Sequence, residues 1–450
     1  MFVERVRIKN VRGFREVDLD LTRPEGEASG WTVLAGRNGS GKSTLLQAIA
    51  LTVSGPATAR SLKESFAGWV REGQTEAEVE VGLSPSQYSD AIAPPPRGEA
   101  YVVISHETSL LVGLRWTAAA ENHEPELTIS RPGDWRSQAG GGPWDENTSG
   151  WFVAGYGPTR RLTGHGAAAQ RLMSGPARIA RLVSLFREDA SLLECVEWLR
   201  DIYLRRLEGK RGAAELEQQV LRLLNDGLLP GQTRVQRIDS EGLWVSQEGV
   251  LLPLEELSDG YRTTAALVMD IVRHLHLCYG DLRLEEGRGP DEPGCRVMDQ
   301  GVVLIDEIDL HLHVSWQQRI GFWLKTHFPN IQFLVATHSP FICQAADPGG
   351  LIRLPAPGEE RPVEHVPEDV YHTVVNGTVD DAVLTELFGL ESPHSDAAEA
   401  LRSRVAELEA QLQTSDVTAE ERDELAALRQ RLPQSMAGDV EQELRRLIEL

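Results

Sequence analysis

A glycine-rich run near the start of the chain contains the residue types best suited to binding phosphate. It matches the pattern GxxxxGK[ST], has one more threonine after it, and consists of Gly36, Arg37, Asn38, Gly39, Ser40, Gly41, Lys42, Ser43 and Thr44. In such a loop the glycines let successive backbone N–H groups face phosphate oxygens, and the helix that follows adds partial positive charge. We therefore predict an ATP site in which Lys42 reaches the β- and γ-phosphates and the Ser43 hydroxyl ligates Mg²⁺.

A second candidate is a short apolar strand that ends in two acids. Residues 302–305 are Val-Val-Leu-Ile, and Asp306 and Glu307 follow them. Such strand ends are common in α/β proteins, so this one takes its weight from the P-loop earlier in the chain. We predict that Asp306 holds Mg²⁺ through water and that Glu307 orients or deprotonates the attacking water.

A third candidate is the run Leu-Ser-Asp-Gly-Tyr-Arg at residues 257–262, before a predicted helix. Ser258 and Gly260 stand where the N–H groups of a helix start attract an anion. A serine that only caps the helix is the ordinary alternative. Because one chain needs a single site for its γ-phosphate, we interpret this second anion site as one that acts on nucleotide bound by a partner subunit.

These candidates require a sheet that brings its strand ends to one edge. Period-two and fully apolar runs predict strands at 3–10, 15–21, 31–35, 76–83, 100–116, 152–158, 234–254, 301–307 and 331–339. Apolar residues at helical spacing predict helices after the P-loop, over 166–226, from about 259, and over 316–328. Residues 118–150 and 281–300 are predicted to be irregular. Strands alternating with helices indicate an α/β fold with crossover connections.

Composition limits the kind of protein this is. Of its 450 residues 41% are hydrophobic and 25% charged, which is ordinary for a globular chain. A net charge of −23 argues against a broad basic surface for nucleic acid, although a local basic groove stays compatible with it. The four cysteines form no CxxC pair, so we expect them buried and reduced. Without a long apolar run or a signal peptide, the simplest compartment is the cytoplasm.

The order of the motifs resembles that of the SMC/RecF/OLD-like branch of ABC ATPases. The resemblance implies a P-loop NTPase fold, an ABC-type head, and a homodimer that closes on ATP and Mg²⁺. It makes residues 257–262 the signature motif, which caps nucleotide in trans, and makes His338, in Thr-His-Ser-Pro, a switch histidine that senses the γ-phosphate. The run Asn-Val-Arg-Gly-Phe at residues 10–14 is similar to that branch's first strand, which implies that Arg12 lies near the nucleotide.

Two further runs are similar to compact AAA-labelled ATPases of bacterial defence islands, including retron and Septu types. They are Gly-Tyr-Gly-Pro-Thr-Arg-Arg at 155–161 and Glu-Ile-Asp-Leu-His-Leu-His at 307–313 with Trp316 and Gln317 after it. Val314 departs from the proline common in that position. The resemblance implies an effector partner, usually an HNH nuclease, and antiviral defence as the role.

Three assignments are left open by the sequence. Gln74 is one candidate for the glutamine loop of ABC ATPases. Arg160 or Arg161 is a candidate for contact with phosphate. His311 and His313 suggest a metal site or, as the preferred interpretation, packing at the dimer interface.

We divide the chain into four parts. Residues 1–162 form the lobe with the P-loop, 163–235 a helical lid insertion, 236–392 the lobe with the signature, acidic strand and histidine, and 393–450 a helical tail. Leucine spacing and a capping box from Thr418 to Glu421 predict a hairpin over 397–432 and a last helix near 439–449. The tail is either a solvated helix pair or a docking surface for a partner. The insertion is too short for the long coiled coil of SMC proteins.

Two functions follow from these features. The first is an ATP hydrolase that regulates a separate effector, a nuclease by the resemblance, in antiviral defence. The alternative is a RecF-like DNA repair ATPase that clamps DNA directly, against which the charge of −23 counts. A transporter subunit fits neither the first strand nor the insertion.

Overall fold

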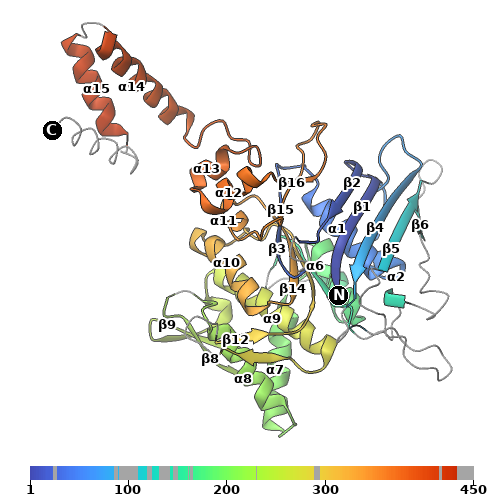
Figure 1. The fold of residues 1–450 in the computed structure, drawn as a ribbon. Helices are drawn as coiled ribbons and strands as arrows, with labels where there is room; N and C mark the ends of the chain where they lie inside the picture. The colour runs from blue at the N-terminus through green and yellow to red at the C-terminus, as the bar shows by residue number, and fades with distance from the viewer. Residues whose placement is uncertain are drawn as a thin grey trace. The chain divides into compact units, whose positions relative to one another are not determined.

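The computed structural model describes residues 1–23, 28–85, 90, 110–118, 124–130, 142–144, 150–160, 162, 166–229, 231–287, 294–414 and 418–432. The chain forms two compact units, Met1–Ala382 and Val383–Leu450 (Figure 1). The first unit contains all the candidate residues for nucleotide binding. Within the described part of the chain, no helix has the length and apolar character needed to cross a membrane.

A six-stranded sheet forms the centre of the first unit. Its order is β16-β15-β3-β14-β13-β7, and all neighbours except β16 and β15 run parallel. The strands are β3 (Gly30–Ala35), β7 (Val153–Tyr156), β13 (Gly301–Ile305), β14 (Ile331–Thr337), β15 (Leu351–Arg353) and β16 (Glu364–His365). The inner strands are apolar and fully buried, as parallel strands covered on both faces must be. The predicted α/β class is confirmed.

The register of this sheet brings the three main motifs to one edge. Ile305 pairs with Val335, and Thr337 pairs with Ala35, so β3, β13 and β14 end side by side. The P-loop follows β3, the two acids follow β13, and His338 follows β14. Carboxyl ends of parallel strands are where open α/β sheets bind ligands.

An antiparallel sheet of order β2-β1-β4-β5-β6 lies in the same unit. It comprises β1 (Phe2–Val11), β2 (Phe14–Asp20), β4 (Glu76–Ser84), β5 (Leu110–Thr117) and β6 (Glu126–Ile129). Helix α1 (Lys42–Ser54) contacts strands of both sheets and is buried along most of its length (Figure 1). The prediction of irregular structure over 118–150 was wrong at β6, which is held by its pairing with β5. Of the predicted strand at 100–116, residues 100–109 lie outside the described part.

Helices fill the segment predicted as an insertion, and further strands follow it. The helices are α4 (Ala167–Met173), α5 (Ala177–Ala180), α6 (Val183–Phe186), α7 (Leu193–Leu207) and α8 (Ala213–Asn225). The strands β8 (Arg234–Asp239), β9 (Gly242–Gln247) and β10 (Val250–Pro253) form a small antiparallel sheet. The 281–300 segment, predicted as a loop, contains a short ladder of β11 (Leu284–Glu286) and β12 (Cys295–Val297).

The remaining helices of the first unit flank its sheets. They are α2 (Pro56–Leu62), α9 (Asp259–Tyr279), α10 (Val314–His327), α11 (Pro340–Cys343) and α12 (Glu368–Asn376), with α13 (Val379–Leu384) at the boundary. Short 3₁₀ turns occur at η1 (Gly142–Trp144) and η2 (Leu254–Glu256). All four cysteines are free; three are buried as predicted, and Cys278 is partly exposed.

The second unit contains a helical hairpin, as predicted. Helices α14 (Asp396–Thr414) and α15 (Ala419–Arg431) enclose a small core of Leu408, Leu425 and Leu428. Arg404 binds Glu424 across the pair through two hydrogen bonds of 3.0 and 2.9 Å. The capping box from Thr418 to Glu421 is present. The predicted last helix near 439–449 lies outside the described residues.

Candidate nucleotide-binding site

The P-loop has a backbone conformation that demands glycine. Gly39 and Gly41 have φ of 80° and 94°, which side chains on L-residues disfavour. A Cβ on Gly41 would also lie 2.5 Å from Cζ of Phe14. Helix α1 begins directly after Gly41 with no side-chain cap, so its first N–H groups are available to an anion.

Lys42 is held inside this loop. Its Nζ donates to the carbonyl oxygens of Gly36 at 2.8 Å and Arg37 at 3.2 Å. Burial lowers the pKa of Lys42, and the nearby carboxylates of Asp306, Glu307 and Asp309 only partly oppose this. The ammonium group therefore lies against the backbone that the sequence predicts to surround phosphate.

Asp306 and Ser43 form the candidate metal site. Burial raises the pKa of Asp306, although a hydrogen bond with Ser43 and the charge of Lys42 act in the other direction. Its Oδ1 is buried and has no hydrogen-bond partner among the described residues. An orphaned carboxylate oxygen beside a hydroxyl is a donor set that suits Mg²⁺, so the residues fit the predicted ion.

Glu307 follows in a strained backbone conformation. Its φ is 44°, in the left-handed region that few non-glycine residues adopt, and the residue is only half-buried. The turn continues to His311, whose φ is 68°. Strained residues of this kind persist where surrounding contacts determine them, often at functional sites.

Arg160, one of the two candidates for contact with phosphate, binds the protein's own backbone instead. Arg160 is 2% exposed, and its guanidinium donates to backbone carbonyls behind the acidic strand end. The acceptors are Gly157 at 2.6 Å, Asp306 at 2.8 Å, Glu307 at 3.0 Å and Ile308 at 3.4 Å. With its donors committed to the protein, this side chain is not available to nucleotide. Arg161 lies outside the described residues.

His338 is placed by a carboxylate that the sequence did not single out. Thr337 Oγ1 and the His338 backbone N–H both donate to Oδ1 of Asp309, the second at 3.4 Å. The His338 residue itself is exposed at the end of β14. Partial burial of the ring and then the charge of Lys42 lower its pKa, so the imidazole is neutral at pH 7.

Arg12 lies beside the start of α1. It is exposed, and its Nη1 is 3.4 Å from Oγ1 of Thr44. Its guanidinium also lies 5.5 Å from the centre of the Trp69 ring, which supports the side chain from below. Arg12 thus lies next to the helix that follows the P-loop, and its proximity to nucleotide stays a prediction.

The start of α9 is exposed at Ser258, whose side chain makes no capping hydrogen bond. A Cβ on Gly260 would lie 2.8 Å from the carbonyl oxygen of His311, so only glycine permits this approach. The start of α9 thus packs on the turn that carries Glu307. The sequence did not reveal this second reason for a glycine.

The two histidines after Glu307 show no metal site. His313 Nδ1 accepts the Ser315 backbone N–H at 3.3 Å and caps α10. No cluster of three or more His, Cys, Asp or Glu suited to a metal occurs among the described residues. Gln74 is exposed in the turn before β4, where its N–H donates to the carbonyl of Arg71.

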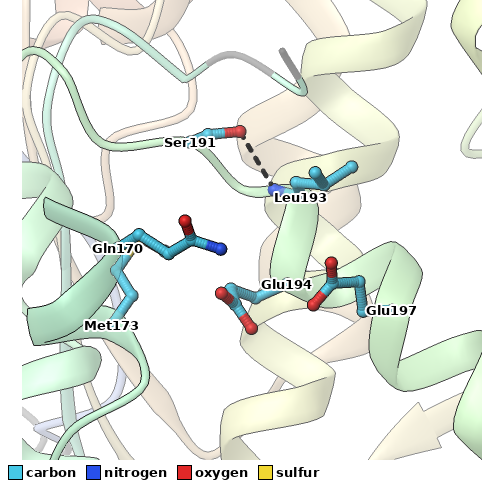
Figure 2. A pocket seen from close by; sticks show the side chains of 6 residues that line it. All are labelled: Gln170, Met173, Ser191, Leu193, Glu194 and Glu197. Carbon is cyan, nitrogen blue, oxygen red and sulfur yellow. Dashed lines mark hydrogen bonds between the residues drawn. The ribbon is translucent and has the colours of Figure 1, made fainter. Parts of the chain in front are cut away.

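A small cavity in the helical insertion is not a nucleotide pocket. Figure 2 shows its lining of Gln170, Met173, Ser191, Leu193, Glu194 and Glu197. Its volume of about 10 Å³ leaves room for about one water molecule. None of the candidate site residues lines it.

Two family models match parts of this chain. An AAA-domain family model matches residues 5–108. A second AAA-domain model, whose description also names the AbiEii toxin of a type IV toxin–antitoxin system, matches residues 179–344. The first match covers the P-loop, and the second covers Ser258, the acidic strand and His338.

Two curated relatives are similar over parts of their length. Septu protein PtuA of Bacillus mycoides (strain KBAB4) is 26% identical over 340 residues, which are 75% of this chain and 38% of that protein. The retron Ec83 probable ATPase of Escherichia coli is 42% identical over 122 residues, which are 26% of this chain and 20% of that protein. The chain thus spans well under half the length of either relative.

Solved structures of SMC heads are similar as well. The SMC head bound to the C-terminal winged-helix domain of ScpA aligns with a TM-score of 0.45 at 13% identity, over 82% of this chain and 99% of that one. The family models and the curated relatives confirm the resemblance drawn from the motifs. Two segments of the chain thus match AAA-domain models, and parts of it are similar to a Septu PtuA protein and to a retron probable ATPase.

Proposed function

We propose that two copies of this ATPase close around ATP, each presenting Ser258 and Gly260 to nucleotide on the P-loop of the other. One observation carries this proposal: the exposed start of α9 packs through Gly260 on the turn that carries Glu307. A partner that meets this surface meets both the signature and the end of the acidic strand. Closure of the dimer on nucleotide would then change the contacts of the turn that carries Glu307.

Within the site, the roles follow from the geometry. Lys42 would neutralise phosphate charge, and Asp306 with Ser43 would hold Mg²⁺, which when bound would offset the charge of the phosphates. Glu307 orients the attacking water, and neutral His338 donates or accepts a hydrogen bond near the γ-phosphate. Arg12 adds positive charge at the start of α1.

Trapping the closed state tests the proposal. Glu307→Gln keeps the shape of the side chain but removes the base, so we expect this variant to bind ATP, turn over slowly and form a dimer visible by light scattering. Adding Ser258→Arg should abolish that dimer while ATP binding persists. Ser61→Arg, at an exposed serine on α2, is the matched control and should leave the dimer intact. A Glu307→Gln variant that stays monomeric with ATP would contradict the shared site.

We further propose that the ATPase regulates a separate effector, a nuclease, in antiviral defence. The similarity to Septu PtuA and a retron ATPase supports this, as do the runs at 155–161 and 307–313. Expressed with its neighbouring genes, the protein should lower the plating efficiency of phage at least tenfold, and Lys42→Ala should remove the effect. Protection by the ATPase alone would contradict a separate effector.

Binding of the isolated protein to DNA distinguishes the alternative function. A DNA clamp makes phosphate contacts, so its affinity falls steeply with salt. We expect no such steep dependence for a regulator of an effector.

A further inference from the structure

Arg160 is the most deeply buried cation described near the site. None of its hydrogen bonds goes to a residue of the P-loop. Its Nη1 donates to the carbonyls of Gly157 and Asp306, and its Nη2 to those of Glu307 and Ile308. One planar guanidinium thus joins the end of β7 to three consecutive residues after β13. Only arginine combines this many donors in a fixed fork.

The charge of Arg160 is costly in this position and is offset by the acids of the site. Burial lowers the pKa of Arg160 to about 10, and the carboxylates of Asp306, Asp309 and Glu307 act in the opposite direction. The guanidinium therefore stays charged at neutral pH. The same three carboxylates also interact with the charge of Lys42.

Three of the four carbonyls that Arg160 binds belong to Glu307, whose backbone conformation is unfavourable, and to its two neighbours. Glu307 has φ of 44°, and Arg160 binds its carbonyl and those of the residues before and after it. A left-handed non-glycine residue relaxes unless neighbouring contacts hold it. The carbonyls of residues 306 and 307 belong to the two peptides that flank the Glu307 Cα, so these hydrogen bonds hold its backbone on both sides.

We propose that Arg160 is a positioning residue for hydrolysis, which holds Glu307 in the conformation that aims its carboxylate at the attacking water. The proposal rests on the role of Glu307 given above. The hydrogen bonds of Arg160 go to the backbone, so it acts through Glu307 and not on the nucleotide. Its removal should therefore impair the chemical step and leave ATP binding nearly unchanged.

Two variants separate this role from a role in folding. Arg160→Lys keeps the charge but has no planar fork, and Arg160→Met keeps the length while removing the charge. Arg160→Met also leaves four carbonyls without their donor, so a lower melting temperature is expected for it, and Arg160→Lys, which keeps a donor and the charge, is the main test. In both variants kcat should fall about 10- to 100-fold, because misplacing a catalytic group by about 1 Å has an effect of this size. The Kd for ATP should change less than threefold.

Arg181→Lys is the matched control. Arg181 is a buried arginine, 7% exposed, whose guanidinium lies over the Phe152 ring at 5.3 Å. It belongs to the same core but makes no hydrogen bond with the turn at residues 306–308 among those described. This variant should melt at lower temperature and keep its kcat.

A double variant tests whether Arg160 acts through Glu307. In single-turnover experiments, Arg160→Lys added to Glu307→Gln should slow hydrolysis less than twofold further. A full additional loss overturns the proposal, as does a normal kcat for Arg160→Lys. Absence of folded protein for both Arg160 variants would make Arg160 a fold residue and would overturn it too. If instead Glu307→Gln hydrolyses ATP at the normal rate, the assignment of Glu307 itself fails.

Discussion

The hydroxyl of Tyr156 donates a hydrogen bond of 3.1 Å to the carboxylate of Asp270, inside the core of the first unit. Tyr156 ends β7, next to the acidic strand, and Asp270 lies on α9, the helix that begins at Ser258. Arg273 and His274 complete the group at 3.1 and 3.3 Å from the same carboxylate. This buried group therefore joins α9, the helix that begins at Ser258, to the sheet whose edge carries the P-loop, Asp306 and His338.

We expect Asp270→Asn to destabilise the first unit strongly. Burial opposes the charge of Asp270, but His274, Arg273 and Tyr156 together lower its pKa, so the carboxylate is ionised in the folded state. Removing it leaves Arg273 buried without its closest partner, which costs about 3–5 kcal/mol. Urea unfolding measures the loss.

The pH dependence of that loss has a definite sign. A carboxyl with a lowered folded pKa stabilises the protein above its unfolded pKa, about 4, and this contribution disappears as pH falls through the folded value. The gap between wild type and Asp270→Asn should therefore narrow in acid. Asp239→Asn, at an exposed pair with Arg237, should cost less than about 1 kcal/mol. A gap that stays constant into acid would contradict an ionised Asp270.

Asp306→Asn, unlike Asp270→Asn, should stabilise the first unit. Burial raises the pKa of Asp306, so the folded protein holds this proton more tightly than the unfolded chain does. Wild type consequently loses stability as the pH rises from the pKa of Asp306 in the unfolded chain through its raised pKa in the folded protein. At pH 7 the neutral amide of Asp306→Asn avoids this loss. Without Mg²⁺, the variant should melt at a higher temperature than wild type.

The same variant should lose its response to the metal. Mg²⁺ with ATP should raise the melting temperature of wild type and of Asp299→Asn, a buried carboxylate away from the P-loop. It should leave that of Asp306→Asn unchanged. If Asp306→Asn melts below wild type without Mg²⁺, burial of the ionised Asp306 carboxylate does not destabilise the folded protein, and the prediction is contradicted.

The sequence predicted those parts of the site that are encoded locally. The P-loop, Asp306 and Glu307, and His338 each lie at the end of an apolar strand, and parallel register alone brings these ends together. The hairpin of the tail followed from leucine spacing and its capping box.

The parts that the sequence missed depend on contacts between distant residues. Arg160 is bound to carbonyls at 306–308, and no local pattern distinguishes a buried arginine from one that faces phosphate. Strands β6, β11 and β12 are three or four residues long and exist through pairing, which leaves little periodicity. The third acid of the Asp-Glu-Ile-Asp run was a signal for Asp309, but its partner Thr337 belongs to another strand.

Lys42→Ala should abolish tight nucleotide binding. The Nζ of Lys42 lies against the loop carbonyls, and without it the β- and γ-phosphates lose their nearest cation. We expect Kd for ATP, measured by calorimetry, to rise at least about 100-fold, which corresponds to about 2.7 kcal/mol. Lys325→Ala removes an ion pair with Asp347 and should leave Kd unchanged. Tight binding by Lys42→Ala would contradict the site.

Asp309 controls the position of His338, and two substitutions at this residue test how. Asp309 accepts hydrogen bonds from Thr337 Oγ1 and from the His338 backbone N–H through one oxygen, Oδ1. Asp309→Asn keeps a carbonyl oxygen there and loses only the charge, so kcat should fall less than about threefold. Asp309→Ala removes the acceptor, frees the end of β14, and should lower kcat about tenfold, equivalent to about 1.4 kcal/mol in the barrier. Steady-state ATP hydrolysis with a separate Kd measurement distinguishes these effects from lost binding. Equal losses in the two variants would mean that the charge of Asp309, which also faces Lys42, matters more than its hydrogen bonds.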